Sequence, residues 1–231
     1  GSWWLDQPRR RQFERIVFAP GGAESDEYNL WQGFAVEAKP GDKHQSFLTH
    51  IRDNVCSGND EHFTYLLGWM ARAVQEPDSP GEVAVVMRGK RGTGKSFFGK
   101  MLGRLFGRHY LSVSNPKHLV GAFNAHLRDA VLLFGDEAFF AGDKQHEGVL
   151  KTLITEEQLI IEGKHVDAEA SPNFLHIVLA SNDEWVVPAG TDERRFFVLD
   201  VGEDKKQDHG YFAAIKNDLD SGGAENLLHF L

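Results

Sequence analysis

Cysteine is nearly absent from this 231-residue sequence, since Cys56 is the only one. A single cysteine excludes internal disulfides and cysteine-rich metal sites, and it favours a reducing, cytosolic compartment. Long apolar runs are also missing: none approaches the roughly 20 residues that a membrane-spanning helix requires, and no signal peptide is visible. We therefore expect no membrane segment.

Acidic residues are missing from one long stretch, although they predominate overall. The net charge is −9, yet residues 83–128 contain nine Lys and Arg residues and no Asp or Glu. This segregation suits a polyphosphate site, and a basic lining on an otherwise acidic protein. A solvated basic face without a ligand is the alternative.

The length allows one good core, or one core with a small appended subdomain. Gly1 and Ser2 look like a cloning scar, so we expect a fragment of a longer protein that begins before Trp3. The parts that we expect are an aromatic-rich arm or linker (3–45), a helical preface (46–80), an α/β core (81–201) and a C-terminal helical tail (202–231).

The stretch from Val83 to Ser96 joins an apolar strand pattern to a glycine-rich turn that ends in Lys-Ser. It fits GxxxxGK[ST], the phosphate-binding loop. Glycines let backbone N–H groups wrap an anion, and the positive amino end of the following helix points at the same place. The expected binding residues are Gly89, Gly92, Thr93, Gly94, Lys95 and Ser96. Lys95 should bridge the β- and γ-phosphates and Ser96 should ligate Mg²⁺; a chance turn is the alternative.

Two carboxylates follow the apolar run from Ala130 to Gly135, which predicts a strand buried on both faces of a parallel sheet. At the end of that strand, we expect Asp136 to hold Mg²⁺ and Glu137 to polarise the attacking water. The next strand that we expect, HIVLASN, ends in Asn182, whose amide can orient the same water. Ordinary turns are the alternative at both places. The combined pattern predicts Mg·ATP hydrolysis.

Arg194 and Arg195 stand directly before the apolar segment FFVLDV. At the start of a strand they are too far from their own phosphate loop, but either could reach a neighbouring subunit's nucleotide as an arginine finger. We favour Arg195 for this role, with Arg194 as the second candidate. Ion pairing with Asp192 and Glu193 is the alternative.

Hydrophobic spacing and turn residues predict the other elements. Two helices are expected between Ser46 and Val74, and Leu159–Glu162 and Phe174–Ala180 are expected to flank a polar loop as a hairpin-like excursion. The remaining expectations are a strand over Tyr110–Val113, a helix from Pro116 to about Leu127, a helix around Gly148–Ile154 and a last core strand over Phe196–Val201.

Aromatic residues are concentrated in residues 3–40, which we expect to form short strands or an extended arm. Buried anchors are favoured over stacking on nucleic-acid bases. These aromatic residues are Trp3, Trp4, Phe13, Phe18, Tyr28, Trp31 and Phe34.

The motifs together resemble the AAA+ core of superfamily 3 helicases, on the ordered phrases GKRGTGKS, LLFGDE, EGKH, VLASN and ERRFFVLDV. Longer phrases resemble the helicase domain of phage and prophage primase-helicase or primase-polymerase proteins: YNLWQGFAVE, YLLGWMARAVQ, NAHLRDAVLLFGDEAFFAGDK and NDEWVVPAGTDERRFF. The resemblance covers about residues 15–201. It implies an α/β P-loop fold with a parallel five-stranded sheet ordered 5-1-4-3-2, flanked by helices.

The resemblance also implies a homo-oligomeric ring, typically a hexamer, that translocates on single-stranded DNA, usually 3′ to 5′. It gives a meaning to Lys164 and His165, which correspond to a Lys-His pair at the tip of a hairpin that grips the DNA backbone in the ring channel. An ordinary exposed turn is the alternative, and Asp167 and Glu169 depart from the basic pattern of that hairpin.

These implications lead to a DNA helicase domain that works in phage or prophage replication, in the cytoplasm of a bacterial host and downstream of a primase or primase-polymerase domain. Two other functions stay open: an AAA+ ATPase that remodels or loads protein, and a nucleotide-dependent assembly module with little turnover.

Overall fold

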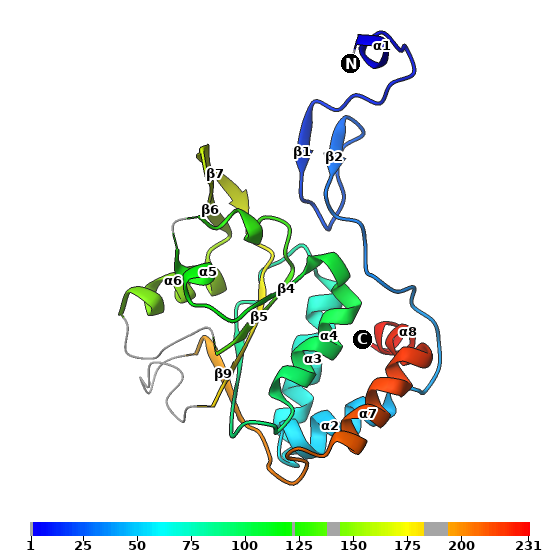
Figure 1. The fold of residues 1–231 in the computed structure, drawn as a ribbon, viewed down its shortest axis with the longest axis vertical. Coiled ribbons are helices and arrows are strands. Elements are labelled where there is room, and N and C mark those ends of the chain that lie inside the picture. Colours follow the sequence, from blue (N-terminus) through cyan, green and yellow to red (C-terminus); the bar gives the residue numbers. More distant parts are fainter. Residues whose placement is uncertain (1, 122, 138–143, 183–193) are drawn as a thin grey trace.

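A parallel sheet of five strands forms the centre of the computed structural model, which describes residues 2–121, 123–137, 144–182 and 194–231 (Figure 1). The spatial order of the strands is β4-β5-β8-β3-β9, and all neighbours are parallel. The strands are β3 (Ala84–Arg88), β4 (Tyr110–Val113), β5 (Leu132–Asp136), β8 (His176–Ser181) and β9 (Phe196–Asp200). Numbered by their order in the chain and read from β9 to β4, they give 5-1-4-3-2, which confirms the predicted sheet.

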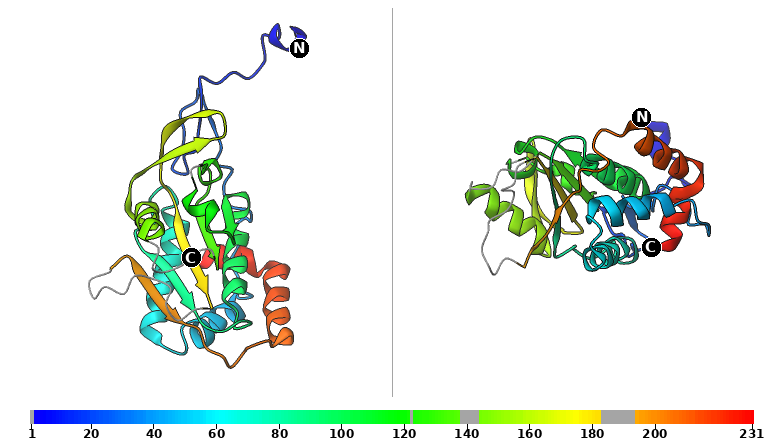
Figure 2. Two further views of the ribbon diagram at one scale, coloured as in Figure 1. Left: turned by 60° about the vertical axis from the view of Figure 1, so that its left-hand side comes forward. Right: turned by 90° about the horizontal axis from the view of Figure 1, so that it is seen from below.

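Alternate residues of each strand face two separate cores, because successive side chains of a strand point to opposite faces. Val85 and Met87 of β3 join one apolar cluster, whereas Ala84 and Val86 join the other. Figure 2 shows the larger group of helices on one side of the sheet and α6 (Lys144–Thr155) on the other. This two-sided burial explains why the strands read as continuous apolar runs.

The predicted preface packs on the larger cluster. It contains α2 (Gln45–His50), which continues as a π-helical segment over Ile51–Val55, and α3 (Asp60–Gln75). Asn59 caps α3, accepting a hydrogen bond from the backbone N–H of His62 at 3.0 Å. The expectation of two helices in this region is confirmed.

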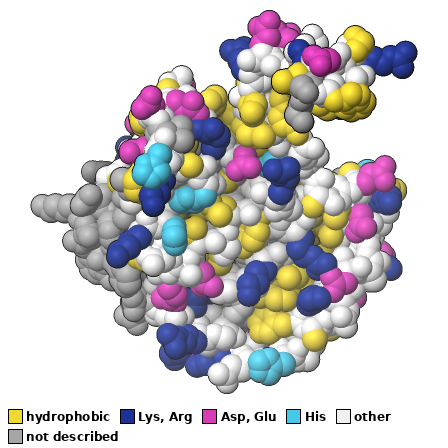
Figure 3. Space-filling model, turned by 45° about the horizontal axis from the view of Figure 1, so that its top comes forward, with side chains coloured by type: hydrophobic (Ala, Val, Ile, Leu, Met, Phe, Trp, Pro, Cys, Tyr) yellow, Lys and Arg dark blue, Asp and Glu magenta, His cyan; other side chains and the backbone are white. Residues whose placement is uncertain are grey.

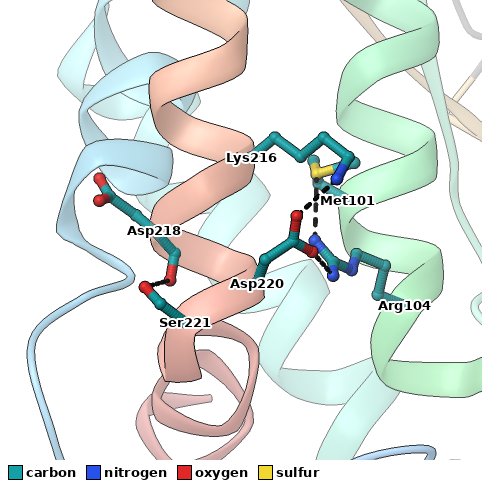
Figure 4. A network of polar contacts seen from close by, with 6 residues as sticks. All are labelled: Met101, Arg104, Lys216, Asp218, Asp220 and Ser221. Atoms are coloured by element: carbon teal, nitrogen blue, oxygen red, sulfur yellow. Dashed lines mark hydrogen bonds and ion pairs between the residues drawn. The ribbon is translucent and has the colours of Figure 1, made fainter.

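The C-terminal tail covers the same side of the sheet. It consists of α7 (His209–Asp218), a π-helical turn over Leu219–Gly223 and α8 (Ala224–Phe230). Asp220 pairs with Lys216 of the tail and with Arg104 of α4 (Lys95–Phe106), so the tail is tied to the helix that follows the glycine-rich loop (Figure 4).

Two predictions about local structure are wrong. The hairpin is formed by β6 (Gln158–Gly163) and β7 (Val166–Pro172), whereas the predicted second arm, Phe174–Ala180, contains the central strand β8. The expected helix from Pro116 to Leu127 is two short pieces, α5 (Lys117–Val120) and a 3-10 turn over Ala125–Leu127. Gly121 ends α5 in an extended conformation (ψ 159°), and so interrupts the helix.

The N-terminal arm extends away from the body (Figure 1) and contains α1 (Ser2–Leu5) and a parallel pair of short strands, β1 (Arg15–Val17) and β2 (Glu27–Asn29). Phe18, Trp31 and Phe34 are anchors as predicted, since they pack on the core around His109 and Phe106. The other arm aromatics are not anchors: their side chains are exposed, namely Trp3, Trp4, Phe13 and Tyr28. Among the described residues, none of the helices has the length and apolar character needed to cross a membrane.

Candidate functional site

The carboxyl ends of β3, β5 and β8 meet at one edge of the sheet, because β8 pairs with both of the other strands. Each strand end delivers predicted residues to this edge. A cavity of about 610 Å³ opens there. Its lining includes Gly92, Thr93, Gly94, Lys95, Ser96, Asp136, Glu137 and Asn182.

The glycine-rich loop depends on its glycines. Gly92 and Gly94 have φ angles of 80° and 103°, in the left-handed region that other residues avoid. Gly94 immediately precedes α4, whose first residues line the cavity, so the positive end of that helix faces it. Gly89 (φ 149°) lies at the start of the loop, and buried Thr93 closes it by donating to the carbonyl of Lys90 at 2.9 Å.

Lys95 lies at the centre of the site, with only 6% of its surface exposed. Its ammonium group donates to the carbonyls of Gly89 and Lys90, at 2.5 and 2.9 Å, and to Oδ1 of Asn182 at 3.0 Å. Burial lowers the pKa of Lys95, an effect that the charges of Glu137 and Asp136 oppose. A bound anion would offer this ammonium group a stronger partner than neutral oxygens.

Ser96 and Asp136 form the part of the site that suits a divalent cation. The Ser96 hydroxyl donates to Oδ2 of Asp136 at 2.8 Å, which joins the first turn of α4 to the end of β5. Mg²⁺ is commonly held by one or two such oxygens together with substrate phosphates and water. Among the described residues no cluster of three His, Cys, Asp or Glu side chains could hold a metal ion without a substrate.

Glu137 and Asn182 lie next to each other across the strand ends. Glu137 has a φ of 57°, uncommon for a residue with a side chain, and its N–H donates to the carbonyl of Ala180 at 2.9 Å. Its Oε1 accepts a hydrogen bond from the backbone N–H of Asn182 at 3.1 Å. The unusual backbone therefore turns a carboxylate towards the cavity, beside an amide.

Several residues that support the loop were missed by the sequence analysis. Asn54, in the preface, donates to the carbonyl of Thr93 at 2.7 Å, and the N–H of Gln207, in the tail, donates to the carbonyl of Gly92 at 2.9 Å. The cavity is also lined by Arg91, Phe97, Ser114, Gln207, His209 and Phe212. Asn54 and Gln207 lie 39 and 115 positions from their loop partners, so no local pattern could reveal these contacts.

The predicted arginines lie at the opposite, amino edge of the sheet. The carbonyl of Arg195 accepts a hydrogen bond from the N–H of Ala84, at the start of β3, at 2.9 Å. The loop begins after Arg88, four residues on, or roughly 13 Å at 3.3 Å per residue. The side chain of Arg195 is half-buried and that of Arg194 is exposed, whereas Asp192 and Glu193 lie outside the described residues.

Lys164 and His165 form the turn between β6 and β7, and both are exposed. His165, the second central residue of this turn, has a φ of 64°, a left-handed value that is uncommon for a residue with a side chain. The base of the hairpin lies at the amino edge, because only three residues lie between the end of β7 and the start of β8. Figure 3 views the molecule from this end, where Lys, Arg and His side chains lie among acidic and apolar ones.

A further exposed aromatic residue lies beside the hairpin. Asn124 is fixed to β6, because its side chain donates to the carbonyl of Ile160 at 2.8 Å and accepts from the N–H of Glu162 at 2.8 Å. The preceding Phe123 is 55% exposed. The sequence analysis missed Phe123, since it expected this segment to be helical.

Together, these features define the class of the protein: an α/β fold with a parallel five-stranded sheet, in which strand β3 is followed by a glycine-rich loop and a helix. Residues 87–195 match a protein family described as a family of unknown function (DUF5906).

The chain is similar to the DNA primase-polymerase of Nitratiruptor phage NrS-1, with 26% identity over 175 residues. The match covers 74% of this chain but only 24% of that relative. An apo structure of the NrS-1 C-terminal region has a TM-score of 0.81 and 22% identity, covering 94% of this chain and 55% of that one. A second apo structure of that region gives a TM-score of 0.78 at 21% identity, covering 93% and 53%.

Proposed function

We propose that this chain is the ATP-driven helicase domain, of the superfamily 3 type, of a phage or prophage replication protein. The observation that carries the proposal is the convergence of Lys95, Ser96, Asp136, Glu137 and Asn182 on one cavity at the carboxyl edge of the sheet. Three separate strand ends supply residues suited to phosphate binding, metal binding and water activation, which is the set that phosphoryl transfer requires.

In this proposal each residue has a defined part. Lys95 leaves Asn182 and the loop carbonyls to bind the phosphates, and Glu137 takes the proton of the attacking water. Asn182 positions that water once its Oδ1 is released from Lys95. Ser96 and Asp136 would hold Mg²⁺, which when bound neutralises charge on the phosphate oxygens.

The amino edge supplies the reason for proposing a ring. Arg195 is roughly 13 Å along the sheet from the start of its own loop, so its guanidinium would serve a neighbouring subunit's nucleotide. Strand β9, which it precedes, is an edge strand, and so it is available to face an adjoining subunit. We propose a homo-oligomeric ring, hexameric in the simplest case.

Single-stranded DNA is the proposed substrate of the hairpin. An exposed Lys-His pair on a two-residue turn can reach a phosphate backbone, with Lys164 as the counter-charge and His165 as a hydrogen-bond donor. Phe123, fixed beside the same hairpin by Asn124, provides an exposed aromatic face that favours a sugar or a base.

The similarity to the NrS-1 primase-polymerase supports the replication context. Because the match spans 24% of that relative, we propose that a primase or primase-polymerase domain precedes this region in the full-length protein. Such a protein would act in the cytoplasm of the infected or prophage-carrying bacterium.

The test is the ATPase rate as a function of protein concentration, with and without single-stranded DNA. The proposal predicts that turnover per chain rises with concentration, because assembly completes each site, and rises again with DNA. Concentration-dependent turnover that DNA leaves unchanged would favour a protein-remodelling ATPase. Assembly on ATP with negligible turnover, even with DNA, would indicate an assembly module.

A further inference from the structure

Part of the lining of the cavity at the carboxyl edge has no role in the proposed phosphate chemistry. It comes from the start of α4 and from the C-terminal tail, which is more than 100 residues further along the chain. This part of the lining contains two aromatic rings, Phe97 and Phe212, and two exposed polar side chains, Gln207 and His209. A triphosphate chain is anionic, so aromatic rings in the lining would not contribute to its binding.

Phe212 is placed directly over the glycine-rich loop. A Cβ atom built on Gly94 would lie 3.0 Å from Cε1 of Phe212, so the ring occupies the space next to the backbone that precedes Lys95. The Phe212 ring also lies 5.0 Å from that of Phe97, centroid to centroid, at an interplanar angle of 55°. It remains only partly buried, and lines the cavity.

The segment that carries Phe212 is fixed relative to the loop. The N–H of Gln207 donates to Gly92, and Asp208 caps α7 by accepting from the N–H of Tyr211 at 3.0 Å. The Tyr211 hydroxyl lies 3.2 Å from Nδ1 of His50 in the preface. Position and orientation of the ring are thus set before a ligand arrives, which reduces the entropy cost of binding.

We propose that the tail segment from Gln207 to Phe212 binds the heterocyclic base of the nucleotide whose phosphates the loop holds. This inference rests on the proposed function and adds the part of the site that recognises the base. Phe212 is the stacking surface, since every base offers a π face to an aromatic ring. The Gln207 amide and the His209 imidazole, which are exposed and line the cavity, can hydrogen-bond with the edge of the base.

Base binding here would also connect the nucleotide to the C-terminal helices. Helix α7 carries Phe212 near its start, and Lys216, one turn further on, pairs with Asp220, which in turn pairs with Arg104 of α4 (Figure 4). A base stacked on Phe212 would therefore contact a tail that is bonded both to Gly92 of the loop and to Arg104 of the helix that follows it.

The experiment measures binding of MgATP and of magnesium tripolyphosphate to the full chain by titration calorimetry. Tripolyphosphate presents the phosphates without the base. We expect the wild type to bind ATP more tightly, and Phe212→Ala to weaken ATP binding about 5- to 150-fold. The same substitution should leave tripolyphosphate affinity unchanged.

Two further variants separate stacking from packing. Phe212→Leu keeps an apolar side chain against Phe97 but removes the π face, so it should lose ATP affinity with unaltered thermal stability. Phe212→Trp should retain ATP affinity. Phe230→Ala, a matched loss of an aromatic ring on α8 outside the cavity, should bind both ligands as the wild type does.

The outcomes distinguish this inference from the proposed function. If the wild type binds ATP and tripolyphosphate equally, or if Phe212→Leu keeps full ATP affinity, base binding by Phe212 is wrong while phosphate binding stands. An equal loss of both ligands in the Phe212 variants would also overturn it. A wild type that binds neither ligand would reject the nucleotide site as a whole.

Discussion

The two edges of the central sheet hold their candidate functional residues in different ways. At the carboxyl edge Lys95, Asn182 and Glu137 are joined by hydrogen bonds within one chain. At the amino edge Lys164 and His165 are exposed on a hairpin tip, and Arg195 is remote from the loop of its own chain. The first arrangement suits the binding of a small anion, whereas the second is an exposed surface that we propose acts on another molecule.

The difference between the two edges follows from the connections that parallel strands carry at each end. Parallel strands bring their carboxyl ends together with loops and helix starts, so phosphate binding arises there. At the amino ends of the strands, the fold does not force the connecting segments to lie close to one another. We therefore expect substitutions at the carboxyl edge to affect each chain alone, and those at the amino edge to depend on neighbours or DNA.

The largest effect is expected for Arg195→Ala. Loss of an arginine finger lowers turnover about 10³-fold or more while ATP still binds. Turnover and ATP affinity should be measured at protein concentrations where rings are present. Wild-type turnover in assembled Arg195→Ala would refute this role, and the same measurement on Arg194→Ala would then test the second candidate.

Paired variants at the carboxyl edge should separate binding from chemistry. Lys95→Ala removes the cation that compensates the phosphates, so tight ATP binding should be lost. Glu137→Gln keeps the size and shape of the side chain, so the variant should still bind ATP. Its rate of ATP hydrolysis should fall about 10²- to 10⁴-fold, because the substitution removes the general base. Calorimetry and phosphate release measure the two properties, and unaltered turnover in Glu137→Gln would exclude it as the base.

Much of this edge could be predicted from the sequence, because its signals are local. The loop, the strand that precedes it and the two carboxylates at the end of β5 each occupy a few consecutive residues, and the polar residue at each strand end marks the edge. Phe212 and Asn54 could not be predicted, since they reach the loop from distant segments by packing alone.

The amino edge was predicted less well for equally physical reasons. Strand β7 reads VDAEASP, and its described side chains are mostly exposed, so it lacks the apolar alternation that marks a half-buried strand. The apolar run over 174–180 was therefore assigned to the hairpin, although most of its residues also belong to the expected strand HIVLASN, which contains the buried strand β8. The helix expected before Leu127 failed at Gly121, where the chain turns to place Asn124 on β6.

Buried histidines at the two edges should make stability fall in acid in the same way. Burial lowers the pKa of His50, behind the loop, and of His176, at the start of β8, to about 4. The unfolded chain takes up these protons near the ordinary value of about 6.5, so stability declines as the pH falls from about 6.5 to about 4, by roughly 3 kcal/mol for each histidine. The free energy of unfolding should be measured with denaturant at pH values of about 7.5 and about 4.5, which lie on either side of most of this titration. The decrease in this free energy between the two pH values should be smaller for His176→Leu than for the wild type. An equal difference would contradict the burial effect.

The smallest effect is expected for Lys164→Ala, which removes one phosphate contact from the hairpin tip. Affinity for single-stranded DNA should weaken, and the slope of log affinity against log salt should decrease by about 0.7, with basal ATP hydrolysis little changed. Lys39→Ala, an exposed lysine beside α8, is the matched control. If assembled Lys164→Ala keeps the affinity and slope of the wild type, DNA is held elsewhere.

The measurement that tests the relation between the two edges most directly is a mixture of Arg195→Ala chains with Glu137→Gln chains, each inactive alone. Our account places an intact Glu137 of one chain against an intact Arg195 of its neighbour at some interfaces, so the mixture should regain measurable ATP hydrolysis. Absence of hydrolysis at every mixing ratio, with rings present, would contradict an amino edge that completes the site of the adjoining chain.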